Sequence, residues 1–409
     1  MTKILLSAFG CAPHRGSDAE VGWKWAMTLA DLGHEVWMIT REVNRQGIDA
    51  ELSKIGSPSN LHFIYFEIPW FLTLTKGIYG RGYVYYDLWQ WGAYRRAREA
   101  HQKYRFDVVH HVTWVSARQP SFMGNLGIPF YFGPVAGGER APWRLRCGYS
   151  ARQWAADIFR DFVNLLIMID PLMWWTFAKA EKIYVTSEQT RRLLPRKFWK
   201  KTIVQLAIAT DWLRHRHLEA GTKESRGTSK DLRILYVGRF IGWKGMHIGL
   251  RAFREVVARN PRARLTMVGR GPEEADWRRL ATSLSLDPYI EWIPWTDRET
   301  LRELYMSHDI FLFPSLHESG GLVVLEALAQ GLPVVCLDLG GPGMVVDASC
   351  GICVKAQDVT QRQVIDAVAE SLMRIANDSQ LRESLAKGAT NRAKRFSWHD
   401  LASSIYEVA

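Results

Sequence analysis

The chain has 409 residues, of which 47% are hydrophobic and 23% are charged, and its formal net charge is +11. This length exceeds the roughly 250–300 residues that a single core supports, so we expect two domains. The composition excludes a low-complexity or repeat protein, and the absence of about 18 consecutive apolar residues argues against a spanning helix.

The opening residues, MTKILLSAFG, indicate a core strand, because their apolar run is too short for a signal peptide. The five cysteines are an odd number, which fits a reducing compartment. We therefore expect the chain to stay in the cytoplasm. Its positive charge indicates acidic partners, namely nucleic acid, anionic lipid or phosphorylated substrates.

The first half of the chain alternates strand-like and helical patterns. Residues 3–9 predict a strand, 20–34 an amphipathic helix and 35–40 a second strand, which together form a βαβ unit. Further strand-like runs lie at 61–68, 107–112, 129–133 and 182–187. These patterns predict a parallel α/β sheet.

A polar, charged stretch at 214–231 interrupts the alternation, which then resumes. Strands are predicted at 233–240, 264–271, 290–295, 310–315 and 333–338, with helices at about 245–259 and in the 320s. The economical interpretation is two doubly wound domains, 1–205 and 206–389, with a helix at about 390–409 packing back on the first. Ligands of such sheets bind beyond the carboxyl ends of the strands, so the inter-domain cleft is the expected site.

Residues 317–336 place Glu318 and Glu326 eight positions apart across a glycine pair. Because glycine is a weak helix former, we expect Glu318 in a loop, Gly320 and Gly321 at a helix start, and Glu326 within the helix. Such a start presents free N–H groups and a positive dipole end to an anion. Two flanking acids indicate a ligand with a phosphate between hydroxyl groups. A simple salt bridge of a surface loop explains the spacing equally well.

Arg239 and Lys244 follow the predicted strand at 233–240. A guanidinium binds phosphate oxygens bidentately and an ammonium acts as a mobile charge, so the pair suits a diphosphate. Taken alone, the loop is more typical of ordinary surface basicity. The Gly-x-Gly at 269–271 lacks the third glycine of a dinucleotide fingerprint and is weak evidence for a nicotinamide cofactor.

Two glycine-containing loops and a histidine pair stand out in the first half. The turn at 14–23, with Gly16 and Ser17, and the loop at 133–140 allow close approach of a phosphate or sugar. His110 and His111 end a strand, where neighbours point to opposite faces, so one can be core while the other faces the cleft. Such a histidine could accept a proton or bind a hydroxyl, although a structural histidine is the simpler interpretation.

No metal-binding constellation is evident, and a metal-dependent mechanism is disfavoured. Cys350 and Cys353 form a single C-x-x-C, but a zinc ribbon needs a second pair and a redox site needs a helix after the first cysteine. Residues 352–354 predict a short strand instead. An ordinary structural role is the better interpretation.

Together these loops resemble the family 4 retaining glycosyltransferases, which have the GT-B fold of two facing Rossmann-like domains. The resemblance covers most of the chain. It rests on the turn at 15–23, the loops at 238–245 and 267–273, the run at 309–335 and the glycines at 338–343. The glutamate pair with seven residues between its members is the most specific of these signatures.

The resemblance implies a retaining, metal-independent transfer of a hexose-type sugar from a nucleotide-sugar to a glycan or polyprenyl-linked acceptor, in polysaccharide or glycoconjugate assembly. The nucleotide-sugar is a substrate, and no cofactor is implied. In the second domain, Arg239 and Lys244 would hold the diphosphate, together with the helix start. Glu318 would bind the sugar hydroxyls and Glu326 the ribose. The donor residues at the helix start are Gly320, Gly321 and Leu322.

In the first domain, the resemblance implies that His111 lies by the reacting carbon and that Gly16 and Ser17 approach the phosphates. The attack would come from the same face, with the leaving phosphate as base. Ser17 stands where the family often has glycine, and the usual His-x-His is replaced by His-His. The acid that often follows the glycines at 340–341 is missing. By a subgroup feature, Glu139 and Arg140 are placed near the acceptor.

Two other functions compete with this interpretation. A nucleotide-sugar epimerase of the same fold would hydrolyse or invert rather than transfer, but it shares the acid pair poorly. A basic protein that binds single-stranded nucleic acid would use the charge and the aromatic residues. No recognised binding module supports it, so no nucleic-acid partner is expected.

Two segments predict peripheral docking of the first domain on the inner face of an anionic membrane. Residues 80–98 place aromatic residues just before arginines, and residues 161–180 hold an apolar run broken by Asp170 and Pro171. Trp and Tyr favour the headgroup level, and cations are attracted to an anionic leaflet. The competing interpretation is that both segments are buried helices, because the aromatics at 83–94 fall nearly all round a helical wheel.

Overall fold

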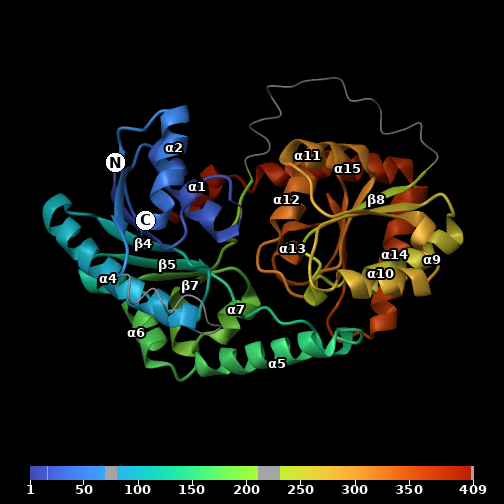
Figure 1. Ribbon diagram of the computed structural model, residues 1–409, viewed down its shortest axis with the longest axis horizontal. Coiled ribbons are helices and arrows are strands. Elements are labelled where there is room, and N and C mark those ends of the chain that lie inside the picture. Colours follow the sequence, from blue (N-terminus) through green and yellow to red (C-terminus); the bar gives the residue numbers. More distant parts are fainter. Residues whose placement is uncertain (16, 70–80, 211–230, 407–409) are drawn as a thin grey trace. The chain divides into compact units, whose positions relative to one another are not determined.

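The computed structural model describes residues 1–15, 17–69, 81–210 and 231–406 (Figure 1). Contacts divide the chain into two compact units. The first unit comprises residues 1–138, 160–207 and 398–409, and the second comprises 139–159 and 208–397. Gly16 and most of the stretch at 214–231 lie outside the described residues.

The first unit contains a seven-stranded parallel sheet in the order β3-β2-β1-β4-β5-β6-β7. Its strands are β1 (Lys3–Ala8), β2 (Glu35–Arg41), β3 (Leu61–Phe66), β4 (Val108–Thr113), β5 (Phe130–Val135), β6 (Lys182–Val185) and β7 (Thr202–Val204). Its helices are α1 (Ser17–Asp31), α2 (Arg45–Ile55), α4 (Arg81–Tyr104), α6 (Pro171–Lys179), α7 (Glu188–Leu193) and α16 (Trp398–Tyr406). The sequence predicted all of these strands except β7.

The carboxyl-terminal helix α16 packs on the first unit, next to α1. The Tyr406 hydroxyl lies 2.8 Å from His110 Nδ1, and the rings of Trp25 and Trp398 meet edge-on at 6.1 Å. The preceding helix, α15 (Ser379–Lys394), belongs to the second unit. After residue 207, the chain therefore returns to the first unit only at α16.

The second unit contains a six-stranded parallel sheet in the order β10-β9-β8-β11-β12-β13. Its strands are β8 (Arg233–Val237), β9 (Arg264–Val268), β10 (Ile290–Ile293), β11 (Ile310–Phe313), β12 (Val334–Leu337) and β13 (Gly351–Val354). Its other helices are α9 (Met246–Arg259), α10 (Glu274–Ser283), α11 (Arg298–Ser307), α12 (Leu322–Ala329), α13 (Gly340–Val345) and α14 (Gln361–Asn377). The strand order reverses between β1 and β4 in the first sheet and between β8 and β11 in the second, as in doubly wound folds.

Residues 139–159 group with the second unit, although a boundary near 205 would place them in the first. Their backbone is held by side chains of the second unit: Gln361 donates to the Cys147 carbonyl at 2.5 Å, and His247 Nε2 lies 3.2 Å from the Leu145 carbonyl oxygen. The Ser150 hydroxyl also donates to Glu273 at 2.9 Å. Such contacts between distant segments leave no periodic signal in the sequence. The division between the units passes through α5 (Ala151–Leu166).

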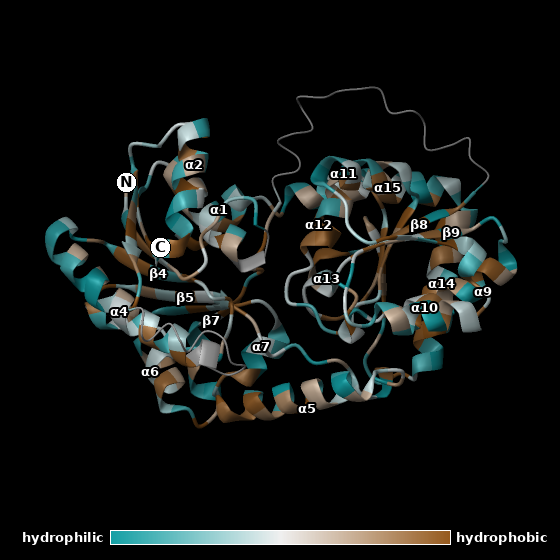
Figure 2. Ribbon diagram, in the orientation of Figure 1, coloured by the Kyte–Doolittle hydropathy of each residue, from teal (hydrophilic) through white to brown (hydrophobic). Residues whose placement is uncertain are grey.

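Among the described helices, none has the length and apolar content needed to cross a bilayer. In the hydropathy colouring of Figure 2, the inner strands of both sheets are largely apolar. Strands buried on both faces need such runs, because helices cover parallel sheets on each side. The run IFLF at 310–313, which forms β11 and is buried throughout, illustrates this.

Candidate functional site

In the second unit, the loops that follow β8 and β11 are joined by hydrogen bonds. These two strands are neighbours, so their carboxyl ends open at the same edge of the sheet. The Leu316 N–H donates to the Trp243 carbonyl at 2.8 Å, and the Ser315 hydroxyl donates to the same oxygen at 3.3 Å. This contact brings the predicted residues Lys244 and Glu318 together, although 74 positions separate them.

Lys244 donates to Glu318 in an ion pair at this edge. The two side chains are 14% and 19% exposed, so both remain open to a ligand. The ammonium also lies 4.8 Å from the centroid of the Phe313 ring. Because water still screens a partly exposed pair, we assign it little stabilising energy. The pair holds a cation and an acid beside a helix start, where both can contact a ligand.

That helix start belongs to α12, and it is formed by Gly321. Its φ of +82° lies in the left-handed region, which glycine adopts without steric cost. No side chain caps this end of the helix, and Leu322 is only partly buried. The first-turn N–H groups and the helix dipole therefore face a position that suits an anion. The prediction of a loop Glu318, a glycine start and a helical Glu326 is confirmed.

The glycines of α13 lie against this loop from the other side. The Gly341 N–H donates to the Glu318 carbonyl at 2.9 Å, and a Cβ on Gly341 would lie 2.2 Å from the Gly320 carbonyl oxygen. Only glycine permits such close backbone contact. The pair at 340–341, which the sequence singled out, therefore fixes the loop that carries Glu318.

Glu326 lies one turn into α12 and is 8% exposed. The Tyr305 hydroxyl, on α11, donates to its carboxylate at 3.2 Å. Burial, and secondarily the negative charge of Glu326, raise the pKa of Tyr305 well above its usual value, so the tyrosine stays a donor. Sequence reasoning missed Tyr305, because a single tyrosine in an amphipathic helix carries no functional signal.

Arg239 lies in the same loop as Lys244, but its side chain is exposed. Its carbonyl oxygen accepts a hydrogen bond from the Tyr236 hydroxyl at 3.3 Å. The structure thus places the backbone of Arg239 firmly while its guanidinium extends from the surface. A role at a diphosphate remains a prediction.

In the first unit, His110 and His111 point to opposite faces of the sheet, as the strand pattern predicted. His110 Nε2 lies 2.6 Å from the Gly133 carbonyl oxygen, on the side of α16. His111 Nε2 lies 3.3 Å from the hydroxyl of Tyr86, which belongs to α4. The prediction that one of them is open differs from the structure, because Tyr86 and Phe132 pack against His111 and leave it 1% exposed.

Burial controls the protonation of both histidines. It lowers the pKa of His111 to about 4 and that of His110 to about 3, because the charged imidazolium is poorly solvated inside the sheet. Both imidazoles are therefore neutral near pH 7. A neutral His111 suits a hydrogen-bonding role better than storage of a positive charge.

The other first-unit candidates differ in what the structure shows of them. Ser17 begins α1, whereas Gly16 lies outside the described residues. Glu139 is buried and Arg140 is exposed, so only Arg140 presents its side chain at the surface. Their proposed contacts with substrate remain predictions.

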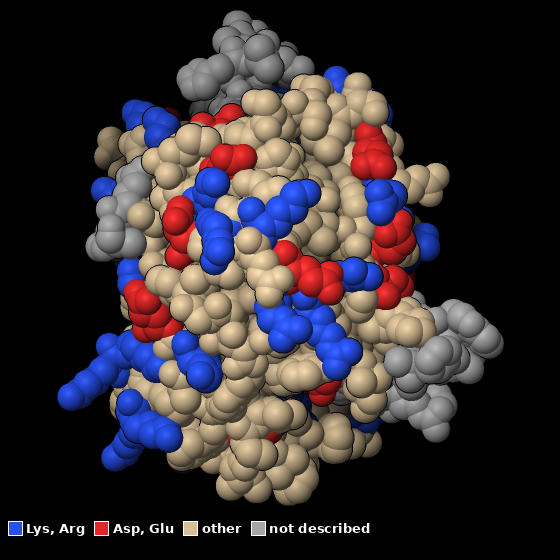
Figure 3. All heavy atoms as spheres, turned by 90° about the vertical axis from the view of Figure 1, so that its left-hand side faces the viewer, with Lys and Arg blue, Asp and Glu red and all other residues tan. Residues whose placement is uncertain are grey.

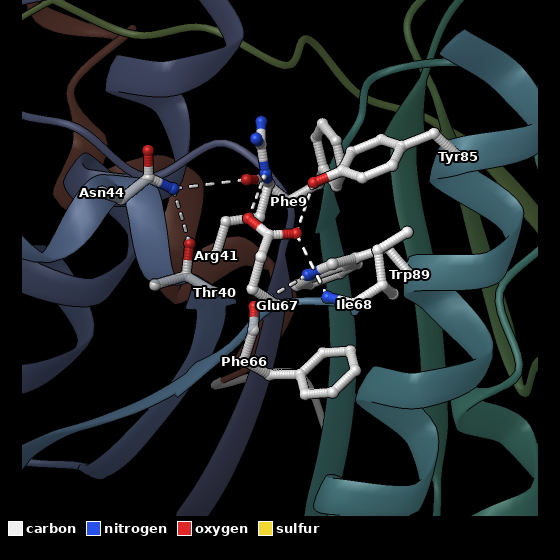
Figure 4. A network of polar contacts seen from close by, with 9 residues as sticks. All are labelled: Phe9, Thr40, Arg41, Asn44, Phe66, Glu67, Ile68, Tyr85 and Trp89. Atoms are coloured by element: carbon white, nitrogen blue, oxygen red, sulfur yellow. Dashed lines mark hydrogen bonds and ion pairs between the residues drawn. The ribbon is translucent and has the colours of Figure 1, made fainter. Parts of the chain in front are cut away.

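The sequence did not single out a polar cluster at the carboxyl ends of β1, β2 and β3 (Figure 4). Arg41 forms an ion pair with Glu67 at 3.4 Å, and its guanidinium carbon lies 4.6 Å from the centroid of the Phe9 ring. The Tyr85 hydroxyl also donates to Glu67. These side chains come from the ends of three strands and from α4, so only the folded unit brings them together.

The cysteines of the described residues are all free. Cys350 precedes β13 and Cys353 lies within it, where the Cys353 sulfur is 3.9 Å from that of Cys336 on the neighbouring strand. Cross-strand packing accounts for this contact. No group of three or more His, Cys, Asp or Glu that could hold a metal ion occurs within the described part of the chain.

Known proteins resemble the chain in sequence over its second half. Residues 221–392 match the family of glycosyl transferases group 1. A D-inositol 3-phosphate glycosyltransferase of Corynebacterium kroppenstedtii is 34% identical over 188 residues, which are 43% of this chain and 40% of that protein. The chain thus spans about two fifths of the length of the curated relatives that it matches.

Solved structures resemble the whole chain. A glycosyltransferase from Rickettsia africae superposes with a TM-score of 0.65 at 16% identity, with 100% of this chain and 97% of that one covered. HepE of Anabaena, determined in complex with UDP, has a TM-score of 0.60 at 14% identity, with 100% and 99% covered. At such identities the likeness concerns the fold. Residues 221–392 are thus similar to the group 1 glycosyl transferases, and the two parallel sheets of the chain are those of the GT-B fold.

Proposed function

We propose that this protein is a retaining, metal-independent glycosyltransferase. It transfers a hexose-type sugar from a nucleotide-sugar to a glycan or lipid-linked acceptor in polysaccharide or glycoconjugate assembly. The observation that carries the proposal is the partly exposed Lys244–Glu318 pair beside the uncapped start of α12. A cation, an acid and free N–H groups in one place suit a sugar diphosphate.

The departing diphosphate is the group that the second unit stabilises. Negative charge builds on its oxygens as the bond to the sugar breaks, and pre-placed donors are most effective against such developing charge. Lys244, the exposed Arg239 and the first N–H groups of α12 supply these donors. On binding, Lys244 exchanges its contact with Glu318 for the phosphate, which frees the Glu318 carboxylate to accept from sugar hydroxyls.

The nucleoside end of the donor is assigned to Glu326. Its carboxylate is an acceptor for the two ribose hydroxyls, and the bond from Tyr305 holds it in one orientation. Burial strengthens such a bond, since few water molecules compete for the carboxylate. The two glutamates then bind opposite ends of one donor.

The first unit is assigned to the acceptor and the reacting carbon. We propose that Ser17 and Gly16 approach the phosphates at the start of α1 and that His111 accepts or donates one hydrogen bond to a sugar hydroxyl. With its pKa lowered to about 4 by burial, His111 is a weak base, so we assign the acceptor proton to the leaving phosphate. The acceptor attacks from the face that the leaving group vacates, which preserves the anomeric configuration.

The donor class is supported by structural relatives, because Anabaena HepE was determined with UDP and with UDP-glucose. The test is saturation-transfer NMR against a panel of nucleotide-sugars, followed by product analysis with the best binder. We expect a nucleotide-sugar to bind and its sugar to appear on an added acceptor with the anomeric configuration unchanged. Release of an epimerised sugar without transfer would instead assign the site to an epimerase, and binding of single-stranded nucleic acid alone would reject both.

A further inference from the structure

Helix α4 exposes one apolar stripe that the core does not use. Val84, Leu88 and Trp91 are spaced by four and three positions, which places them on one face of the helix. All three are exposed, whereas the aromatic residues between them are buried. One face of α4 is therefore buried, as the alternative of a buried helix predicted, and the other face is apolar and exposed.

A second apolar stripe lies at the end of α5 and the start of α6. Six of its side chains are between 42% and 76% exposed: Phe162, Leu165, Leu166, Met168, Ile169 and Leu172. Figure 2 shows this part of α5 in brown. Folding has left these residues in water, although burial of a single one is strongly favourable. We call the two stripes together the apolar surface.

The two stripes are joined by aromatic rings. The exposed Trp91 meets Phe122 edge-on at a centroid distance of 5.2 Å, and Phe122 lies 5.8 Å from Trp175 on α6. Trp175 follows Leu172 within the same helix. The apolar surface is therefore one continuous area of the first unit. A contiguous area of this kind on a monomer marks an interaction site.

Cations border the apolar surface on both sides. Arg95 lies 5.6 Å from the Trp91 ring, and Lys197 lies 3.9 Å from the ring of Trp174, whose indole N–H donates to the Met168 carbonyl at 2.8 Å. Lys197 belongs to the short helix η5 (Arg196–Lys201), which packs on α6. Residues 160–201 hold nine Lys or Arg against four Asp or Glu, so this part of the chain is net positive.

We propose that the apolar surface docks the protein on an anionic lipid bilayer without spanning it. Apolar side chains enter the acyl boundary, tryptophans lie at the headgroup level, and the bordering cations meet anionic lipid. Each such cation raises binding about fivefold. A second copy of the chain fits less well, because a symmetric pairing would bring the same cations together. In Figure 3, the lower part of the face, at the height of α5 and α6, shows mostly uncharged atoms.

The experiment is flotation of the full chain with vesicles of phosphatidylcholine, with and without phosphatidylglycerol. The test variant carries Leu165→Glu and Ile169→Glu, and the matched control carries Val43→Glu and Ile55→Glu, which change exposed apolar residues of the same unit away from this surface. We expect wild type and control to float with anionic vesicles, and the test variant to lose binding by about tenfold or more.

Three outcomes would overturn the proposal. These are equal flotation of the test variant and wild type, equal binding to neutral and anionic vesicles, and a wild-type dimer in sedimentation that the test variant alone abolishes. The last would assign the surface to a second copy. Circular dichroism and unfolding of both variants check that each is folded. Transfer to a soluble acceptor should be unchanged in the test variant, so a failure of docking is distinct from a failure of the proposed activity.

Discussion

The edge of the second sheet and the corresponding edge of the first are built from similar strands. They differ in whether the side chains at the strand ends are exposed and charged or buried and neutral. At the second sheet, Lys244 and Glu318 stay partly exposed and charged beside a helix start. At the first, His110 and His111 are buried, and burial keeps them neutral. Two sheets of one topology thus present a charged surface and an uncharged interior at the ends of their central strands.

This contrast teaches that topology places a site while the covering side chains decide its chemistry. Tyr86 and Phe132 cover His111, whereas close backbone contacts of glycines hold the loop of Glu318, whose side chain stays 19% exposed. A residue that is open to water can exchange its partner for a substrate at little cost. A buried residue can give up a partner only when another hydrogen-bonding group replaces it, or when its protonation changes.

The largest effect is expected at Lys244. The Lys244→Ala variant should lower kcat/KM by about 10²-fold or more, a loss of about 2.7 kcal/mol, because a cation that stabilises the leaving diphosphate is removed. Steady-state kinetics measure this. Lys387→Ala changes an exposed lysine of α15 and should leave the rate unaltered. Full activity of Lys244→Ala would remove the role of Lys244 at the diphosphate. Complete loss of wild-type activity in EDTA would contradict a metal-independent mechanism.

Replacement of Glu326 tests the most buried acidic residue of the candidate site in the second unit. The Glu326→Ala variant should weaken binding of a nucleoside diphosphate by about 1–3 kcal/mol, because charge-assisted bonds to ribose are lost. Calorimetry with the free nucleotide measures it, and Glu383→Ala, at an exposed position of α15, is the control. Unchanged affinity in folded Glu326→Ala would remove the ribose role.

The buried histidines predict a pH dependence of stability. Because their folded pKa lies below the unfolded value of about 6.5, the unfolded chain binds more protons as the pH falls, and stability decreases from about pH 6.5 downward. Each contributes a slope of about 1.4 kcal/mol per pH unit between its two pKa values. Urea unfolding of His111→Gln between pH 4.5 and 6.5 should show a shallower slope.

The control for that series is His399→Gln, which alters a partly exposed histidine of the same unit. It should retain the wild-type slope. An equal slope in wild type and His111→Gln would show that His111 is already exposed in the folded protein, and the contrast between the two sheets would then fail.

The smallest effect is expected at Tyr305. The Tyr305→Phe variant removes one hydrogen bond to Glu326 and should weaken nucleotide binding by about 0.5–1.5 kcal/mol. A double-mutant cycle with Glu326→Gln separates this positioning role from loss of packing. If the two substitutions are additive, Tyr305 does not act through Glu326.

Much of the fold follows from local pattern in the sequence. Alternating apolar runs and amphipathic stretches indicated two parallel α/β sheets, and glycine's weak helix propensity placed the start of α12 before Glu326. These features depend on neighbours within a few residues, so they can be predicted from a single sequence. The spacing of the two glutamates also pointed to the family that residues 221–392 match.

Only the tertiary structure decided which distant groups meet. It joined Lys244 to Glu318 and gave Glu326 its partner Tyr305, because neighbouring strands bring together loops that are far apart in sequence. It buried His111 and grouped residues 139–159 with the second unit, where no periodic pattern reports such contacts. Burial depends on which side chains pack from other segments. The sequence supplies the side chains, and the assembled sheets determine their exposure to solvent, their charge and their contacts.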